Sequence, residues 1–199
     1  MSEKPFSQAC ENNQQAIFTI LERVFAQAQH VLEIGSGTGQ HAAYFAPRLP
    51  HLIWQTSDQA EYHPGINAWL DASAAENLRR PLLLNVDMPQ WPIATVDAVF
   101  SANTCHIMGW ASVVAMFHQL ANVLSAGGTL AIYGPFNYDG QFTSPSNANF
   151  DQWLKQRGPQ QGIRDFEAVD KLASEAGMTL LEDNAMPANN RLLVWRKGW

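Results

Sequence analysis

The chain has 199 residues, of which 46% are hydrophobic and 15% are charged, and its formal net charge is −6 at pH 7. This composition is typical of a folded globular protein and excludes a disordered chain. A chain of this length forms one domain by default, so we expect a single domain over residues 1–199.

Alternating helical and strand patterns run along the first two thirds of the chain. Apolar residues spaced three to four apart predict a helix over about 11–28. Strands are expected at 30–34, 52–54 (leading to Asp58), 81–86, 96–100 and 129–133. The 81–86 run fits a strand that is buried on both faces. Helices are expected over 42–49, 66–75 and 113–124, the last ended by Gly127 and Gly128.

The last third begins with a connection rich in Gly, Pro, Ser and Asn over residues 134–149. Connections of this length are typical of lids over functional sites. A helix is expected over about 165–176, with Gly177 as its C-cap, and runs at 178–181 and 192–195 would form a closing antiparallel pair. Strands that alternate with helices predict an α/β sandwich with a mostly parallel sheet.

The acidic balance argues against nucleic acid as a partner, because such binding uses Lys and Arg to neutralise phosphates. No apolar stretch approaches the roughly 18 residues that span a bilayer, and the N-terminus lacks a basic start before an apolar run. We therefore expect a cytoplasmic protein without a membrane partner. Two cysteines and unclustered histidines provide neither a disulfide framework nor a metal-ligand pattern, so no metal is expected.

A glycine loop follows the first expected strand, in the segment VLEIGSGTG at residues 31–39. Glycines allow the backbone to approach a ligand closely, and the next helix offers free N–H groups. The spacing G-x-G-x-G departs from the dinucleotide pattern G-x-G-x-x-G. The carboxylate of Glu33 suits an ammonium group better than a pyrophosphate, and S-adenosylmethionine carries an ammonium, a sulfonium and no phosphate. The sequence therefore assigns Glu33, Gly35, Ser36 and Gly37 to binding of this cofactor.

Two acids at the ends of the next strands extend this site. Asp58 can accept both hydroxyls of an adenosine ribose. Asp87 can accept a hydrogen bond from the exocyclic amine of adenine, with Met88 in apolar contact with the adenine ring. Structural alternatives remain open: a helix cap or turn for Asp58, an Asx-type turn for Asp87, and a tight strand-to-helix turn for the glycine loop.

With these residues in place, the sequence resembles the class I S-adenosylmethionine-dependent methyltransferases. The resemblance includes VLEIGSGTG, Asp58, NVDMP, DAVFSANTCHI and LSAGGTLAIYGPF. More narrowly, the chain resembles the DUF938 family through GSGTGQHAAYFA, IWQTSD, SANTCHI, YGPF, SNANFD, GIRD and MPANN. The resemblance implies S-adenosylmethionine as cofactor. It also implies a Rossmann-like three-layer sandwich whose mostly parallel seven-stranded sheet has an antiparallel last strand. It assigns no substrate.

The loop after the fourth expected strand holds the catalytic candidates, because in this fold it faces the methyl group. Methyl transfer from a sulfonium mainly requires alignment, and a base is needed only for a protonated nucleophile. Asn103 and His106 are the candidates, although His106 could also be a loop histidine that bonds the backbone. Cys105 is better explained as a small buried hydrophobic residue.

Substrate-binding candidates lie further along the chain. Tyr133 ends the fifth expected strand, Arg164 could bind a carboxylate or phosphate, and Asn189 and Asn190 could bond polar groups of the substrate. The sequence favours simpler roles for two of these sets: a surface ion pair for Arg164 with Asp165, and a hairpin turn for the two asparagines.

The function predicted from the sequence is methyl transfer from S-adenosylmethionine by in-line displacement to a small-molecule acceptor. Two alternatives remain: an NAD(P)-dependent oxidoreductase, and a non-catalytic S-adenosylmethionine-binding sensor or partner subunit. The acceptor atom and the oligomeric state stay open, because function depends on the site and not on the fold.

Overall fold

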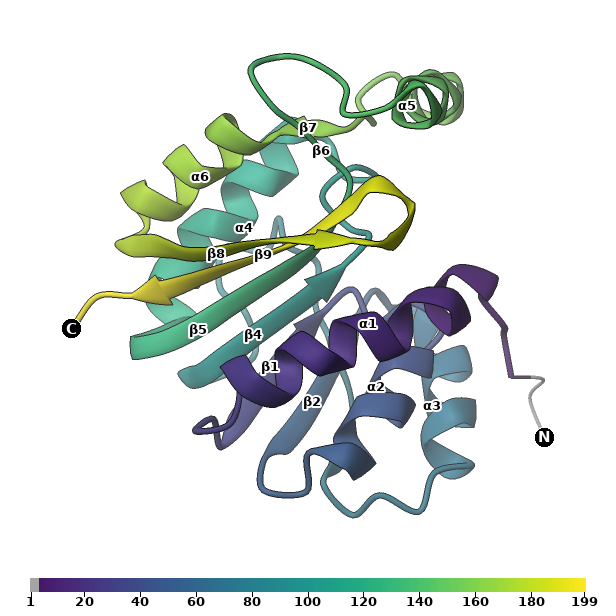
Figure 1. Ribbon diagram of the computed structural model, residues 1–199. Coiled ribbons are helices and arrows are strands. Elements are labelled where there is room, and N and C mark those ends of the chain that lie inside the picture. The colour runs from purple at the N-terminus through teal and green to yellow at the C-terminus, as the bar shows by residue number, and fades with distance from the viewer. Residues whose placement is uncertain (1–3) are drawn as a thin grey trace.

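The protein is an α/β sandwich built on one large sheet (Figure 1). The computed structural model describes residues 4–199. The strands are β1 (His30–Ile34), β2 (Ile53–Asp58), β3 (Leu78–Leu83), β4 (Val96–Ala102), β5 (Leu124–Gly134), β6 (Phe136–Asn137), β7 (Arg164–Asp165), β8 (Met178–Met186) and β9 (Asn190–Lys197). The α-helices are α1 (Gln8–Val24), α2 (Gln40–Phe45), α3 (His63–Asp71), α4 (Trp110–Val123), α5 (Pro145–Arg157) and α6 (Phe166–Glu175). Short 3-10 turns occur at η1 (Ala46–Arg48), η2 (Ala60–Tyr62) and η3 (Pro187–Asn189).

The seven-stranded sheet has the order β3-β2-β1-β4-β5-β9-β8, and β6 and β7 form a separate two-stranded sheet. Every pair from β3 to β5 is parallel, whereas β9 pairs antiparallel with both β5 and β8. The three-layer architecture and the antiparallel last strand expected from the sequence are therefore confirmed.

Two apolar clusters fill the spaces on either side of the sheet. Val31 belongs to the cluster that α1 and α2 cover, and its neighbour Leu32 belongs to the cluster that α4 and α6 cover. This alternation follows from the two-residue period of a strand. A parallel sheet covered on both faces brings the carboxyl ends of its strands to one edge, where the connecting loops gather.

Several predicted boundaries were wrong for local reasons. Helix α1 begins earlier than expected, because the Ser7 hydroxyl accepts the N–H of Cys10 at 3.3 Å and caps it. Strand β3 begins earlier as well and lies at the edge of the sheet, where Leu83 is 53% exposed. The expectation of a strand buried on both faces was therefore wrong. Gly127 and Gly128 do not end α4 but lie within β5, which follows α4 directly.

The expected long connection over 134–149 was also partly wrong, because its last residues form the first turns of α5. The Ser144 hydroxyl accepts the N–H of Asn147 at 3.1 Å, and Pro145 occupies the first turn. Helix α5 lies beyond the carboxyl ends of the strands, at the top right of the view past β6 and β7, whereas α2 and α3 lie at the lower right (Figure 1). It is therefore in a position to border a site at that edge.

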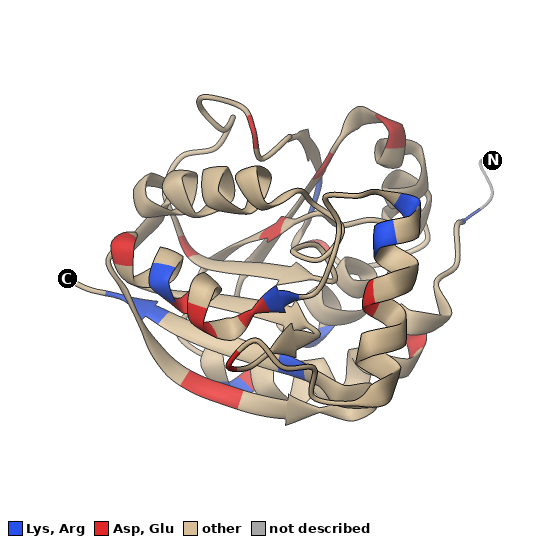
Figure 2. Cartoon of the chain, turned by 90° about the horizontal axis from the view of Figure 1, so that it is seen from above, with Lys and Arg blue, Asp and Glu red and all other residues tan. Residues whose placement is uncertain are grey.

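The chain carries charges of both signs on its surface. Seen from above, Lys and Arg are interspersed with Asp and Glu over the elements (Figure 2). Among residues 4–199, no helix is both long and apolar enough to cross a membrane.

Candidate cofactor and active site

The loops that follow β1, β2 and β4 meet at the carboxyl edge of the sheet. The N–H of Ser36 donates to the carbonyl of Ser57 at 2.9 Å, which joins the first loop to the end of β2. The loop after β4 packs closely against the loop after β1, since a Cβ at Gly35 would lie 2.6 Å from Cγ2 of Thr104. The tertiary structure therefore brings together the segments that hold the cofactor and catalytic candidates.

The three glycines of the first loop differ in what surrounds them. Gly35, Gly37 and Gly39 all have positive φ, at +70°, +56° and +88°. A Cβ at Gly39 would lie 2.9 Å from Cα of Ile66, so this glycine and Gly35 are required by close packing. A Cβ at Gly37 would meet no atom within 4 Å. The middle glycine therefore borders open space, where a ligand can approach the backbone.

Glu33 is a buried carboxylate whose hydrogen-bond donors are neutral, and it is only 2% exposed. Its Oε2 accepts hydrogen bonds from the Ser36 hydroxyl at 2.8 Å and from the Trp54 indole at 3.1 Å. Burial raises the pKa of Glu33 to about 7. Residues 4–199 supply neither a salt-bridge cation nor a donor to Oε1. The site is thus suited to a ligand that brings a positive charge.

Asp58 ends β2 and holds the glycine loop in place. Its Oδ2 accepts the N–H of Gly37 at 2.8 Å, and its Oδ1 accepts the N–H of Gln59 at 2.8 Å. Burial raises the pKa of this carboxyl, and the two backbone donors oppose that effect. A carboxylate offers about four lone-pair sites, so two remain for the hydroxyls of a ligand.

Asp87 and Met88 lie in the loop after β3, and Asp87 is exposed. Oδ2 of Asp87 accepts a hydrogen bond from the Ser112 hydroxyl of α4 at 3.0 Å. The Asx-type bond in this turn is made by the side chain of Asn85, which accepts the N–H of Asp87 at 3.0 Å. The Asp87 carboxylate is therefore not used by the turn itself.

The loop after β4 presents both catalytic candidates. Asn103 adopts a positive φ of 59°, and its N–H donates to the carbonyl of Tyr133 at 2.9 Å. His106 is 5% exposed, and burial together with the nearby Arg164 charge lowers its pKa to about 4. Its imidazole is therefore neutral at pH 7. Cys105 is buried, and burial raises the pKa of its thiol to about 11, as expected of an inert thiol.

Arg164 has a structural role that the sequence did not predict. Its Nε donates to the carbonyl of Cys105 at 3.0 Å, and its Nη2 donates to the carbonyls of Met108 and Gln160. The described residues include no ion pair between Arg164 and Asp165, so that interpretation was wrong. The guanidinium instead ties the loop that carries His106 to the segment before β7.

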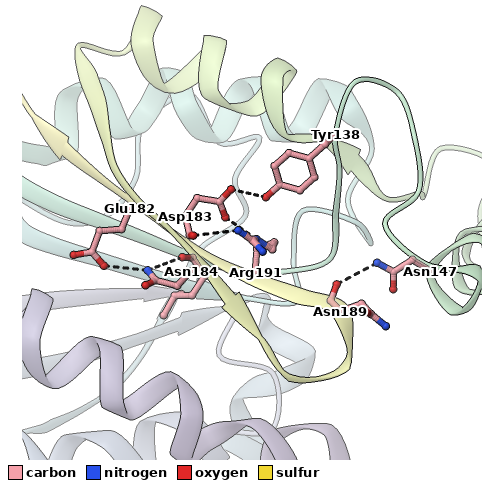
Figure 3. Close-up of polar contacts among 8 residues, drawn as sticks. Tyr138, Asn147, Glu182, Asp183, Asn184, Asn189 and Arg191 are labelled. Atoms are coloured by element: carbon pink, nitrogen blue, oxygen red, sulfur yellow. Dashed lines mark hydrogen bonds and ion pairs between the residues drawn. The ribbon is translucent and has the colours of Figure 1, made fainter.

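Asn189 and Asn190 lie at the tip of the β8–β9 hairpin, which confirms the hairpin interpretation. The carbonyl of Asn189 also accepts a hydrogen bond from the Asn147 side chain at 3.2 Å, which links the hairpin to α5 (Figure 3). Tyr133 is 3% exposed. Its pKa is raised, because the effect of burial exceeds the lowering effect of hydrogen bonds with Asn13 and Asn190.

A second link joins the same hairpin to the chain that follows β6. Tyr138 donates its hydroxyl hydrogen to Oδ2 of Asp183 at 2.8 Å, and Nε of Arg191 donates to Oδ1 of the same carboxylate at 2.6 Å (Figure 3). The segment that leads from β6 into α5 is therefore attached to the sheet at both of its ends.

Sequence reasoning missed several residues around the site. Trp54 donates to Glu33 from the neighbouring strand, and α1 reaches the site through Asn13, whose Oδ1 lies 2.7 Å from Nε2 of His41. The pair Gln40-His41 directly after the glycine loop was the available signal. Phe150, whose ring centroid lies 5.4 Å from that of His106, was missed because no helix was expected between the 134–149 connection and the helix at about 165–176.

Two surface cavities are lined by other residues than these. One of about 230 Å³ is bordered by α1, β8 and β9, near Arg23 and Glu182. The other is bordered by α3 and β3, near His63 and Arg80. Neither is lined by the residues of the glycine loop or by His106. Within residues 4–199, no group of three or more His, Cys, Asp and Glu side chains could hold a metal ion.

A family model described as "Protein of unknown function (DUF938)" matches residues 4–197. An O-methyltransferase family protein from Burkholderia thailandensis matches the structure with a TM-score of 0.82 at 17% identity, over 93% of this chain and 56% of that chain. The S-adenosylmethionine-dependent methyltransferase SibL in its apo form matches with a TM-score of 0.80 at 17% identity, over 96% and 56%. NcsB1, an O-methyltransferase from neocarzinostatin biosynthesis in complex with S-adenosylmethionine and 2-hydroxy-5-methyl naphthoic acid, matches with a TM-score of 0.78 at 14% identity, over 96% and 55%. These likenesses show a Rossmann-like methyltransferase fold, and this chain spans about half the length of each of these solved structures.

Proposed function

The chain belongs to the DUF938 family, and we propose that it is an S-adenosylmethionine-dependent methyltransferase acting on a small molecule. Solved structures of S-adenosylmethionine-dependent methyltransferases share its fold, and one of them contains S-adenosylmethionine together with a naphthoic acid. Because fold alone does not determine function, the proposal depends on the residues of the site.

Glu33 is the observation that carries this proposal. A buried carboxylate whose pKa is raised to about 7 gains stability from a cation placed beside it. Glu33 would bind the ammonium of the cofactor, while Gly37 leaves room for it along the backbone. Asp58 would accept the ribose hydroxyls, and Asp87 and Met88 would contact the adenine.

The bound cofactor supplies a methyl group on a sulfonium, which is a good leaving group. The task of this chain is therefore to orient the acceptor and, where the acceptor is a hydroxyl, to remove its proton. His106 would accept that proton, because its pKa of about 4 leaves the imidazole neutral at pH 7. Asn103 would orient the acceptor from the same loop, and Tyr133, Asn189 and Asn190 would border it.

A nicotinamide oxidoreductase fits this site less well. The dinucleotide pyrophosphate lies against the N-terminus of the helix after the first strand, and here the buried Glu33 carboxylate lies in that region. An anionic ligand would have no cation to meet there and would be repelled by Glu33 and Asp58. The remaining alternative is a protein that binds the cofactor only as a sensor or partner subunit. Measuring turnover distinguishes that role from catalysis.

Calorimetric titration with S-adenosylmethionine, S-adenosylhomocysteine and NADH tests the proposal. We expect saturable binding of the two sulfur nucleotides and none of NADH. Asp58→Ala should weaken binding about tenfold or more through loss of charge-assisted hydrogen bonds. Asp71→Ala is the matched control, because this exposed acid at the end of α3 pairs with Arg80 of β3, and its replacement should leave binding unchanged.

Failure of both sulfur nucleotides to bind would contradict the proposal, and binding of NADH alone would support the oxidoreductase. Transfer of radiolabelled methyl groups to components of a metabolite extract would separate catalysis from a sensor role. Binding without any transfer would favour the sensor.

A further inference from the structure

Helix α5 is held firmly above the site by one of its faces. Asp151, which is 3% exposed, accepts the N–H of Ile163 at 2.8 Å through Oδ1 and pairs with Lys155 at 2.6 Å through Oδ2. Leu154 is fully buried, and Asn147 bonds the hairpin. The helix is therefore attached at its first turn, its middle and the segment that follows it.

A second stripe of α5 carries three flat groups at helical spacing. The rings of Phe150 and Trp153 stack with centroids 5.6 Å apart and planes 19° apart, and the Arg157 guanidinium lies 4.7 Å from the Trp153 ring centroid. Trp153 remains 47% exposed. This series of residues, Phe150, Trp153 and Arg157, is named the α5 ladder.

The α5 ladder extends from the catalytic candidate His106 to the last turn of α5. At one end, Phe150 meets His106 edge-on, with ring centroids 5.4 Å apart and planes 69° apart. At the other end, the Arg157 charge lowers the pKa of Tyr62, which burial and the charges of Asp58 and Glu61 raise. Tyr62 ends η2, which begins two residues after Asp58, and is 44% exposed. The ladder thus begins beside His106 and ends at the Arg157 guanidinium.

Charges differ between the cofactor candidates and the α5 ladder. The cofactor side holds the carboxylates of Glu33, Asp58 and Asp87, which favour a cationic ligand. On the ladder side, the carboxylate of Asp151 is already paired with Lys155, and Arg157 has no acidic partner among residues 4–199. An aromatic wall that ends in a free guanidinium is suited to a flat ligand with a negative charge.

We propose that the α5 ladder recognises the methyl acceptor, and that this acceptor is a flat aromatic molecule bearing both a hydroxyl and an anionic group such as a carboxylate. The rings would pack against Phe150 and Trp153, the anionic group would pair with Arg157, and the hydroxyl would face His106. The acceptor oxygen forms a bond to the methyl carbon while the methyl–sulfur bond breaks and its electron pair stays on sulfur. The hydroxyl proton passes to the His106 imidazole. This inference rests on the proposed function.

Acceptor chemistry agrees with the environment of His106. A base whose pKa is about 4 is weak, so it removes a proton efficiently only from an acidic hydroxyl. A phenolic hydroxyl is far more acidic than that of an aliphatic alcohol, and an aromatic acceptor therefore suits this base.

The test uses three probes titrated into the full chain, with and without saturating S-adenosylhomocysteine. The probes are naphthalene-2-carboxylate, its neutral carboxamide, and cyclohexanecarboxylate. We expect the aromatic carboxylate to bind about five- to tenfold more tightly than either of the others. Arg157→Gln should remove its advantage over the carboxamide, and Trp153→Ala should remove its advantage over cyclohexanecarboxylate.

Two controls keep these variants interpretable. Arg48→Gln removes another guanidinium that lies over an aromatic ring, that of Tyr44 at 3.7 Å, and Trp199→Ala removes another exposed tryptophan. Both should bind the probes like the unmodified chain. Because Trp153 and Arg157 are exposed side chains, their replacement should leave the folded structure intact.

Each outcome decides between the two proposals. Binding of S-adenosylhomocysteine without preference for the aromatic carboxylate overturns the ladder inference and leaves the proposed function standing. Preferential binding of the aromatic carboxylate without S-adenosylhomocysteine binding supports the ladder as an anion site and overturns the proposed function. A preference that survives both Trp153→Ala and Arg157→Gln overturns the assignment to α5.

Discussion

Replacement of Glu33 by glutamine should stabilise the ligand-free protein at alkaline pH while weakening cofactor binding. The pKa of this carboxyl is raised from 4.5 to about 7 by burial. A carboxyl with a raised pKa contributes stability below its unfolded pKa and loses it as pH rises through the folded pKa. The difference of about 2.5 units corresponds to about 3 kcal/mol of folding free energy lost above pH 7 in the unmodified chain. Glu33→Gln removes this loss, since its amide oxygen can still accept from Ser36 and Trp54.

Urea denaturation at pH 5 and pH 8 measures this effect. The difference in unfolding free energy between Glu33→Gln and the unmodified chain should increase by up to about 3 kcal/mol from pH 5 to pH 8. The exposed Glu175→Gln on α6 is the control and should show no such increase. In calorimetry, the affinity of Glu33→Gln for S-adenosylhomocysteine should fall about tenfold or more at pH 8. The same difference in stability at both pH values would refute the reasoning about burial.

Two further predictions separate packing from ligand contact and test the role of Arg164. Gly35→Ala should lower the melting temperature strongly because its Cβ would clash with Thr104, whereas Gly37→Ala should cost only about 1 kcal/mol from its positive φ and mainly weaken cofactor binding. Equal melting temperatures for the two variants would contradict this. Arg164→Met should raise the pKa of His106 from about 4, since the Arg164 charge helps to lower it, and should shift the acidic limb of the pH–rate profile upward. NMR titration of His106 checks this directly, and an unchanged pKa would exclude the electrostatic effect of Arg164.

The features that sequence reasoning predicted correctly depend on local patterns. The strand at 30–34, the glycine loop after it and the acid at Asp58 follow one another in an order that an α/β fold imposes.

Helix α5 also has a local signal that sequence reasoning did not use. Ser144 and Pro145 form a helix start, but a composition rich in Ser, Asn and Pro was given more weight. Without a helix expected after residue 149, the sequence does not place Phe150, Trp153 and Arg157 on one helix face, and the α5 ladder is not predicted.

Contacts between distant segments were decided by the tertiary structure alone. Arg164 bonds the carbonyl of a residue 59 positions earlier, and Asn147 bonds that of a residue 42 positions later. Sequence periodicity reports which face of an element is buried but not which segment covers it. The exposure of Leu83 has the same origin, because an apolar run does not reveal that its strand lies at the edge of the sheet.

The sequence by itself therefore determined the fold class and the cofactor candidates, because both arise from short-range patterns repeated in a fixed order. The tertiary structure decided the environment of those residues. Burial raises the pKa of Glu33 and lowers that of His106, and it does so through neighbours contributed by other strands and loops. Desolvation depends on the complete three-dimensional arrangement, so no local pattern along the chain can encode it.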